Sequence, residues 1–193
     1  MKKILASGQA EQTITKSRFV AAAEYCDSEH AVAMMLRRLA AQHPHASHLA
    51  FAYKIRAPEG ILQRFHDAGE PSGTAGKPIM QYLEGHDLIN ACVAVVRYYG
   101  GINLGTGGLA RAYGGTAKLA LEVATLGDFV EMRRIEVALD YAQLDRFLRD
   151  AEKLHAEILG KDFGERVTIT ASVPADVAQE LLDRHCGNQT RSQ

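Results

Sequence analysis

Two glycine-rich segments on either side of an apolar strand constrain the fold more than any other feature of the sequence. The first is residues 67–78 (DAGEPSGTAGKP), and the second runs from Gly100 to Gly108. Between them, residues 90–99 (NACVAVVRYY) are apolar enough to predict a buried strand. The first segment holds too many glycine and proline residues for regular structure. We therefore expect two irregular loops beside a sheet, with a helix over residues 109–125 after the second loop.

The rest of the N-terminal region alternates strands and helices. Along residues 47–56, Leu49, Phe51, Tyr53 and Ile55 occupy every second position, which is a strand pattern. The other elements predicted here are one or two strands over 12–25, an amphipathic helix over 29–42 that ends at His43-Pro44, a partner strand over 61–66 and a short helix over 79–88.

The character of the sequence changes near Gly127-Asp128, where the glycine richness ends. Beyond this point the pattern predicts strand, helix, strand, strand and helix, over 132–140, 142–154, 155–160, 165–173 and 174–186. A ferredoxin-like unit needs one more strand, and the polar stretch from Gly187 to Gln193 is too short to supply it convincingly. The sequence thus predicts an α+β protein with a first domain over 1–127. The second domain, over 128–193, is a small ferredoxin-like (βαββα) domain whose last strand is either lost or supplied by another chain.

Composition indicates a cytoplasmic protein and excludes several classes. The three cysteines, Cys26, Cys92 and Cys186, are far apart and form no CxxC pair, which argues against a disulfide framework or a zinc ribbon. Gln9 and Glu11 follow the basic start of the chain closely, so a secretory leader is not predicted. No run of about 18 apolar residues predicts a membrane span. A net charge of −1 is not typical of a strongly basic nucleic-acid binder.

The first glycine-rich loop is not a P-loop. A P-loop requires GxxxxGK[ST], whereas Pro71 stands five residues before Gly76 and Pro78 follows Lys77. Its glycines still allow positive φ and close backbone approach. Two readings stay open: the loop presents backbone N–H groups to an anion, or it makes a tight connection packed on the sheet.

The second loop contains a loose dinucleotide fingerprint that begins at Gly105. A Rossmann site places its first glycine directly after the strand, and here the five residues from Gly100 to Leu104 intervene. A helix that starts near Gly108 would still attract anions at its N-terminus. We expect Arg97 and Arg111 to add charge-assisted contacts to a phosphate.

Tyrosines lie among these arginines and glycines. Aromatic rings beside cations can stack on bases. We expect one of Tyr98, Tyr99 and Tyr113 to be exposed and at least one to pack in the core.

Histidines and serines supply no convincing chemistry. His43, His45 and His48 form HxHxxH, a spacing that suits neither a helical metal pair nor a zinc finger. No GxSxG elbow surrounds any serine. We therefore expect no catalytic set, no metal site and no cofactor.

Several of these blocks together resemble the signature of the IMPACT/YigZ family. The matching stretches, in the right order and spacing, are Asp67 to Pro78, Val95 to Ile102, Leu104 to Leu109 and Arg111 to Gly114, with Ser17-Arg18-Phe19 near the start. The resemblance is strong over about residues 10–125. The remainder resembles the small C-terminal domain of bacterial members in architecture more than in motif. Two positions depart from the family, which often has a second aspartate in place of Ala68 and a second histidine in place of Leu49.

The resemblance has implications for fold and function. It implies a ribosomal protein S5 domain 2-like N-terminal domain, also seen in elongation factor G, and a C-terminal domain similar to another elongation factor domain. It implies that eukaryotic members regulate translation by competing for an activator of the kinase that acts on initiation factor 2. This sequence has no partner-binding extension of the eukaryotic kind, so we do not expect that pathway here. For bacterial members it implies a role near ribosomes or RNA.

We therefore expect a regulatory binding protein of the translation machinery rather than an enzyme. It would contact RNA phosphate or a ribosomal or translation-factor partner through the two loops, with Glu70 orienting the first. The expected contact residues are Glu70, Ser72, Gly73, Thr74, Gly76, Lys77, Arg97, Tyr98, Gly100, Gly101, Gly105, Gly107, Gly108 and Arg111. One alternative is an enzyme or sensor for a small phosphorylated ligand in the same loops, with Glu70, Asp67 or His48 as the acid–base group. Another is a protein–protein adaptor that uses the sheet edge of the C-terminal domain.

Overall fold

A computed structural model describes residues 1–186 and divides the chain into two compact units, Met1–Phe129 and Val130–Gln193. The first unit is built on a five-stranded antiparallel sheet with the strand order β2-β3-β6-β4-β5. Its strands are β2 (Gly8–Ile14), β3 (Ser17–Tyr25), β4 (His48–Ala57), β5 (Gly60–His66) and β6 (Ala91–Tyr98). The central strand β6 therefore carries the apolar run that lies between the two glycine-rich segments.

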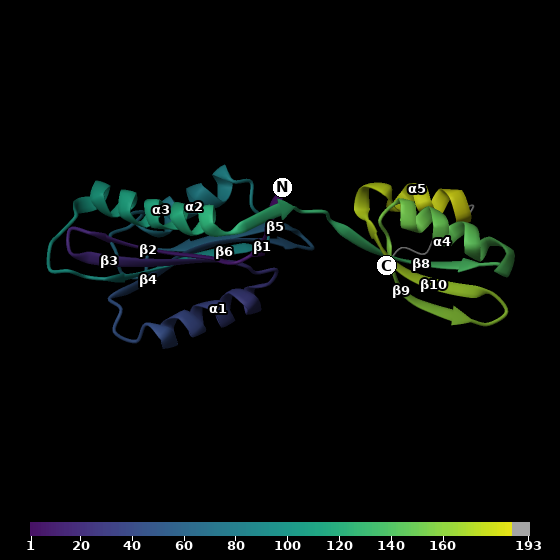
Figure 1. The fold of residues 1–193 in the computed structure, drawn as a ribbon, viewed down its shortest axis with the longest axis horizontal. Helices are drawn as coiled ribbons and strands as arrows, with labels where there is room; N and C mark the ends of the chain where they lie inside the picture. Colours follow the sequence, from purple (N-terminus) through teal and green to yellow (C-terminus); the bar gives the residue numbers. More distant parts are fainter. Residues whose placement is uncertain (187–193) are drawn as a thin grey trace. The chain divides into compact units, whose positions relative to one another are not determined.

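Helices cover both faces of this sheet (Figure 1). The helix α1 (Glu29–Gln42) lies on one face, and α2 (Gly76–Gly85) and α3 (Gly105–Val123) lie together on the other. The start of α1 is set by Ser28, whose side chain accepts a hydrogen bond from the backbone of Ala31 at 3.2 Å. Because Pro44 follows the helix, His43 leaves the helical conformation and the helix ends.

The two faces of β6 belong to two separate apolar clusters. Val93 and Val95 pack in the cluster under α2 and α3, whereas Cys92 and Ala94 pack in the cluster under α1. A strand that is buried on both faces has no polar alternation, which explains its continuous apolar sequence. The prediction of a buried strand here is confirmed by residues Ala91 to Arg97, all of which are buried.

A second, two-stranded sheet joins the two ends of the first unit. It pairs β1 (Lys2–Ala6) with β7 (Thr125–Asp128) in antiparallel register. Neither strand was predicted. The sequence at β1 resembles the start of a leader, and β7 is a four-residue segment that follows α3 directly, so local pattern identifies neither.

The second unit forms one three-stranded antiparallel sheet, in the order β8-β10-β9, with two helices on one face (Figure 1). The elements are β8 (Met132–Leu139), the 3₁₀ turn η1 (Tyr141–Gln143), α4 (Leu144–Lys153), β9 (Glu157–Phe163), β10 (Val167–Pro174) and α5 (Ala175–Cys186). A partly buried pair joins the helices, since His185 Nε2 lies 3.0 Å from Asp150 Oδ2. The prediction of an α+β chain with a small βαββα second unit is confirmed. The expectation that the last strand of a ferredoxin-like unit is either lost or supplied by another chain concerns residues 187–193, which lie outside the described residues.

Candidate functional site

The backbone N–H groups of the first glycine-rich loop bind a carboxylate of the same loop, that of Asp67. Asp67 Oδ2 accepts a hydrogen bond from the backbone of Gly73 at 2.8 Å. Asp67 Oδ1 accepts from the backbones of Ala75, at 3.0 Å, and Gly76, at 2.8 Å. The N–H groups that were expected to receive an external anion are therefore occupied by an internal one. Of the two readings of this loop, the structure favours a tight connection packed on the sheet.

The helix after this loop begins earlier than predicted, at Gly76 instead of residue 79, so the prediction of irregular structure up to Pro78 is wrong at its end. Pro78 is tolerated because it lies in the first turn, where its missing N–H leaves no bond unmade. A Cβ at Gly76 would lie 2.7 Å from the backbone nitrogen of His66, so only glycine allows α2 to start against the end of β5. Gly76 thus has a packing role.

Asp67 should contribute to stability in a pH-dependent way. Desolvation raises the pKa of its carboxyl, but the three backbone N–H groups from Gly73, Gly76 and Ala75 together outweigh this and lower the pKa below its ordinary value. A lowered folded-state pKa means that the contribution is present above the unfolded pKa of about 4 and is lost as the pH falls through the folded value. We expect Asp67→Asn to lower the free energy of unfolding by about 1 kcal/mol at pH 7.

This difference should shrink as the pH falls below the unfolded pKa of about 4 and then through the lowered folded-state pKa of Asp67, because the carboxyl becomes neutral first in the unfolded and then in the folded protein. Thermal unfolding of both proteins between pH 3 and pH 7 measures it. Glu59→Gln, in the exposed turn between β4 and β5, serves as the control and should track wild type throughout. An Asp67→Asn defect of constant size across this range would contradict the role of the charge.

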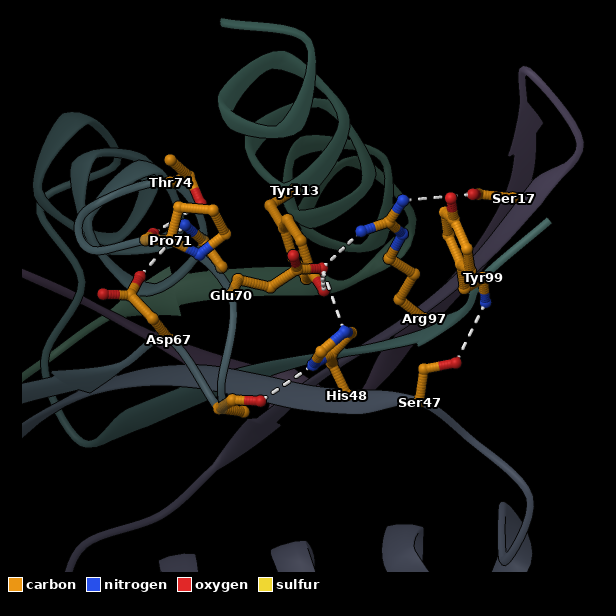
Figure 2. A network of polar contacts seen from close by, with 12 residues as sticks. Ser17, Ser47, His48, Asp67, Glu70, Pro71, Thr74, Arg97, Tyr99 and Tyr113 are labelled. Atoms are coloured by element: carbon orange, nitrogen blue, oxygen red, sulfur yellow. Dashed lines mark hydrogen bonds and ion pairs between the residues drawn. The ribbon is translucent and has the colours of Figure 1, made fainter. Parts of the chain in front are cut away.

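The first part of the loop enters a buried polar network centred on Glu70 (Figure 2). The Glu70 side chain is 4% exposed, and its Oε1 accepts hydrogen bonds from Arg97 Nη1 at 2.7 Å and from the Tyr113 hydroxyl at 2.8 Å. His48 Nε2 lies 3.8 Å from the same oxygen, while its Nδ1 donates to the backbone carbonyl of Ala68 at 2.9 Å. Loop, β4, β6 and α3 are therefore tied together at one carboxylate.

The Tyr113 hydroxyl donates a hydrogen bond to this network and keeps its proton. Burial raises the pKa of its hydroxyl above the ordinary value, and the hydrogen bond to Glu70 raises it further. Tyr113 therefore acts as a neutral donor at any physiological pH.

Arg97 lies inside the protein and not on its surface. Its side chain is 5% exposed, and the guanidinium lies near two aromatic rings, with Cζ 5.5 Å from the centroid of Phe19 and 5.2 Å from that of Tyr99. Nη2 donates to Ser17 Oγ at 3.2 Å, and Nε is buried with no hydrogen-bond partner among residues 1–186. Arg97 was expected to contact a phosphate directly. Its buried position does not favour such a contact, because Glu70 already neutralises its charge.

Ser17 connects this network to the second glycine-rich loop. Its hydroxyl oxygen also accepts a hydrogen bond from the backbone of Gly100 at 3.2 Å. A Cβ at Gly100 would lie 2.1 Å from the backbone of Lys16, so the loop and the β2–β3 turn touch through their main chains. Sequence reasoning missed Ser17 as a member of the network, although Ser17-Arg18-Phe19 was part of the family resemblance.

The second loop and the start of α3 are exposed. The helix begins at Gly105, so Gly105, Gly107 and Gly108 lie in its first turn and the predicted start near residue 108 was late. The N-cap residue, Leu104, gives no side-chain hydrogen bond to the free N–H groups. Arg111 lies one turn further on, and its Nη1 would be 3.5 Å from a Cβ at Gly107. Glycine-rich backbone and a cation thus meet at an uncapped helix N-terminus.

The remaining predicted residues fall into two groups. Exposed or partly exposed positions are Ser72, Gly73, Lys77, Tyr98, Gly100 and Gly101, whereas Thr74 is buried and donates its hydroxyl to the carbonyl of Pro71 at 2.7 Å. Of the three tyrosines, Tyr99 is exposed (47%), Tyr98 is half-buried beside His43, and Tyr113 is buried. The expectation of one exposed and one core tyrosine is confirmed.

Fold and site together define a class: a two-domain α+β protein whose first domain holds glycine-rich loops around a buried Glu–Arg–Tyr network. The sequence matches the model of the Impact N-terminal domain over residues 15–121 and that of a domain of unknown function, DUF1949, over residues 137–184. The chain belongs to the IMPACT family.

Relatives of similar length support this membership. An IMPACT family member of Haemophilus influenzae is 37% identical over 182 residues, which cover 92% of this chain and 88% of that one. The IMPACT family member YigZ of Escherichia coli is 35% identical over 171 residues, covering 88% and 84%. A crystal structure described as that of a hypothetical protein superposes with a TM-score of 0.71 at 32% identity, covering 95% of this chain and 89% of that one.

Proposed function

We propose that this protein is a regulatory binding protein of the translation machinery and that it contacts RNA phosphate through the second glycine-rich loop. Membership in the IMPACT family supports the translation assignment. The observation that carries the contact surface is the start of α3, where exposed Gly105, Thr106 and Gly107 leave backbone N–H groups open to solvent. A helix of 19 residues adds its dipole to these groups, which favours an anion.

Two side chains add to this surface. The Arg111 guanidinium is exposed beside Gly107 and forms no ion pair with residues 1–186. The exposed ring of Tyr99 precedes the loop and is available to stack on a base. Because the net charge is −1 and few cations gather here, we expect modest affinity with a weak dependence on salt.

The alternative of an acid–base enzyme has less support. A general acid or base at neutral pH needs a pKa moved toward 7. The described carboxyls with a clear shift, Asp67 and Asp150, both have a pKa below the ordinary value. Glu70, the carboxylate at the centre of the network, is buried and paired with Arg97. We therefore infer that the network holds the loops in place and that the surface binds a partner.

Sedimentation of cell lysate through sucrose gradients tests the proposal. In low salt we expect wild type to travel with ribosomal particles and Arg111→Glu to stay at the top, because the substitution places a like charge beside the phosphate. Arg37→Glu, exposed on α1 on the opposite face of the sheet, is the matched control and should travel like wild type. Wild type that stays at the top would overturn the proposal, and phosphorylated metabolites would then be screened by thermal shift.

A further inference from the structure

The strand β5 forms an open edge of the first unit's sheet. It pairs with β4 over its whole length in unbroken register, from Gly60 opposite Ala57 to His66 opposite Phe51, and has no partner strand on its other side among residues 1–186. Natural edge strands are usually protected by proline, by a bulge or by an inward-pointing charge. The sequence of β5 (GILQRFH) contains no proline, and its pairing shows no register shift.

Large apolar side chains are exposed on this edge strand. Ile61 is 46% exposed and Phe65 is 49% exposed. The opposite edge strand, β2, presents the polar side chains of Gln9, Glu11 and Thr13 instead. The two edges of the sheet thus differ, because β2 presents polar side chains whereas β5 exposes two large apolar side chains beside one charge, Arg64, which pairs with Glu29.

A groove of about 500 Å³ lies between β5 and α2. From β5 it is lined by Gln63 and Phe65, together with Arg64, and from α2 by Lys77, Met80, Gln81 and Glu84. Phe65 and Met80 provide its apolar part. The two charges of α2 stand at opposite ends, since Lys77 and Glu84 are seven residues, or about 10 Å, apart along the helix. A backbone edge and a side-chain groove therefore run side by side.

We propose that this edge and groove, the β5–α2 groove, bind an extended peptide segment of another protein by antiparallel strand addition. In such binding the main chain of the peptide pairs with the strand edge, and its alternate side chains enter the adjoining pocket. Residues i, i+2 and i+4 of an extended peptide span about 13 Å, which is comparable to the distance from Lys77 to Glu84. The complementary segment has an acidic residue, an apolar residue and a basic residue at these three positions.

The direction follows from the fold. Because Gly76 lies against His66, Lys77 stands at the His66 end of β5 and Glu84 further toward the Gly60 end. An antiparallel peptide runs from the His66 end toward the Gly60 end, so its acidic residue comes first. The proposal goes beyond the translation assignment, because it concerns a different surface and needs no RNA.

A synthetic peptide tests the proposal with the purified full-length chain. The probe is a blocked heptapeptide, Thr-Glu-Thr-Leu-Thr-Lys-Thr, and its counterpart has the Glu and Lys exchanged. Titration of ¹⁵N-labelled protein should shift amide signals of β5 and α2, slow the hydrogen exchange of β5 and leave β10 unchanged. We expect the first peptide to bind about tenfold more tightly than the second, because its Glu lies next to Lys77 and its Lys next to Glu84, whereas the second peptide places like charges together.

Charge exchange in the protein provides the decisive comparison. The double variant Lys77→Glu, Glu84→Lys keeps the net charge and should reverse the preference between the two peptides. Phe65→Ser should weaken both, and Lys161→Glu on β9 should change neither. The proposal is overturned if neither peptide slows exchange in β5 at millimolar concentration, or if the charge-exchanged variant keeps the wild-type preference. A concentration-dependent dimer that Phe65→Glu dissociates would also overturn it, because a second copy would then occupy the edge.

Discussion

Replacing Glu70 by alanine should lower the free energy of unfolding of the first unit by about 3–5 kcal/mol, because it leaves Arg97 buried without a counter-charge. Both partners are almost fully buried, so solvent does not screen the loss. The Tyr113 hydroxyl also loses its acceptor. Hydrogen exchange read by mass spectrometry over β6 measures the effect, and exchange over β10 in the second unit provides an internal reference.

Two further variants separate the charge from the general effect of substitution. Glu84→Ala removes an exposed glutamate and should change stability by less than about 0.5 kcal/mol. The double variant Glu70→Leu, Arg97→Met should recover most of the loss, since two apolar side chains replace the ion pair and neither charge stays unpaired. If Glu70→Ala behaves like Glu84→Ala, or if the double variant is less stable than both single variants, the charge pairing is not what stabilises this region.

Replacing Gly100 by alanine should destabilise the second loop and its link to the network. The added Cβ would lie 2.1 Å from the carbonyl carbon and oxygen of Lys16, closer than any real contact. The turn it meets cannot easily yield, because Thr15 and Lys16 already have positive φ angles of 45° and 65°. We expect a loss near the upper end of the 1–3 kcal/mol range typical of overpacking, visible in thermal unfolding.

Gly107 provides the matched control for this substitution. Its Cβ would meet only the end of the Arg111 side chain, at an ordinary 3.5 Å, and it lies in the first turn of α3. Gly107→Ala should therefore be neutral or stabilise by up to about 1 kcal/mol, since alanine favours the helix. Equal losses at both positions would show that the contact with Lys16 is not what selects glycine at residue 100.

Elements whose pattern reflects their own burial were predictable from the sequence. The strand β6 is apolar from Ala91 to Val96 because it is buried on both faces. The strand β4 alternates because its large apolar side chains lie in the cluster under α1, whereas the small Ala50 and Ala52 are buried on its other face. The helices α1 and α5 were placed within about one residue, since an N-cap serine or an early proline marks where each begins. In these elements the structure that the local sequence favours is also the one that the tertiary environment stabilises.

Elements defined by distant partners were not predictable. Gly76 and Gly105 were assigned to loops because glycine is typical of loops, whereas both begin helices. The reason at Gly76 is the backbone of His66, ten residues earlier in the chain, which no local pattern reveals. In the same way, β1 and β7 are strands because they pair with each other across almost the whole first unit.

The sequence located the candidate site but did not reveal how its charged residues pair. Glu70, Arg97 and Arg111 were all singled out, yet the sequence could not tell that Glu70 neutralises Arg97 across 27 residues and leaves Arg111 alone at the surface. Asp67 was considered as an acid–base group, but it stabilises the loop by accepting backbone hydrogen bonds from Gly73, Ala75 and Gly76. Charge counts along a sequence do not distinguish a paired cation from a free one.

The pairing of β1 with β7 has a consequence for synthesis of the chain. Residues 2–6 leave the peptidyl transferase centre among the first, but their partner strand is not made until residues 125–128 are added. At a translation rate of about 5–20 residues per second, the first strand waits about 6–25 s for its partner. The nascent chain can assemble its five-stranded sheet before β1 pairs with β7. The pairing of these two strands would therefore mark completion of the first unit on the ribosome.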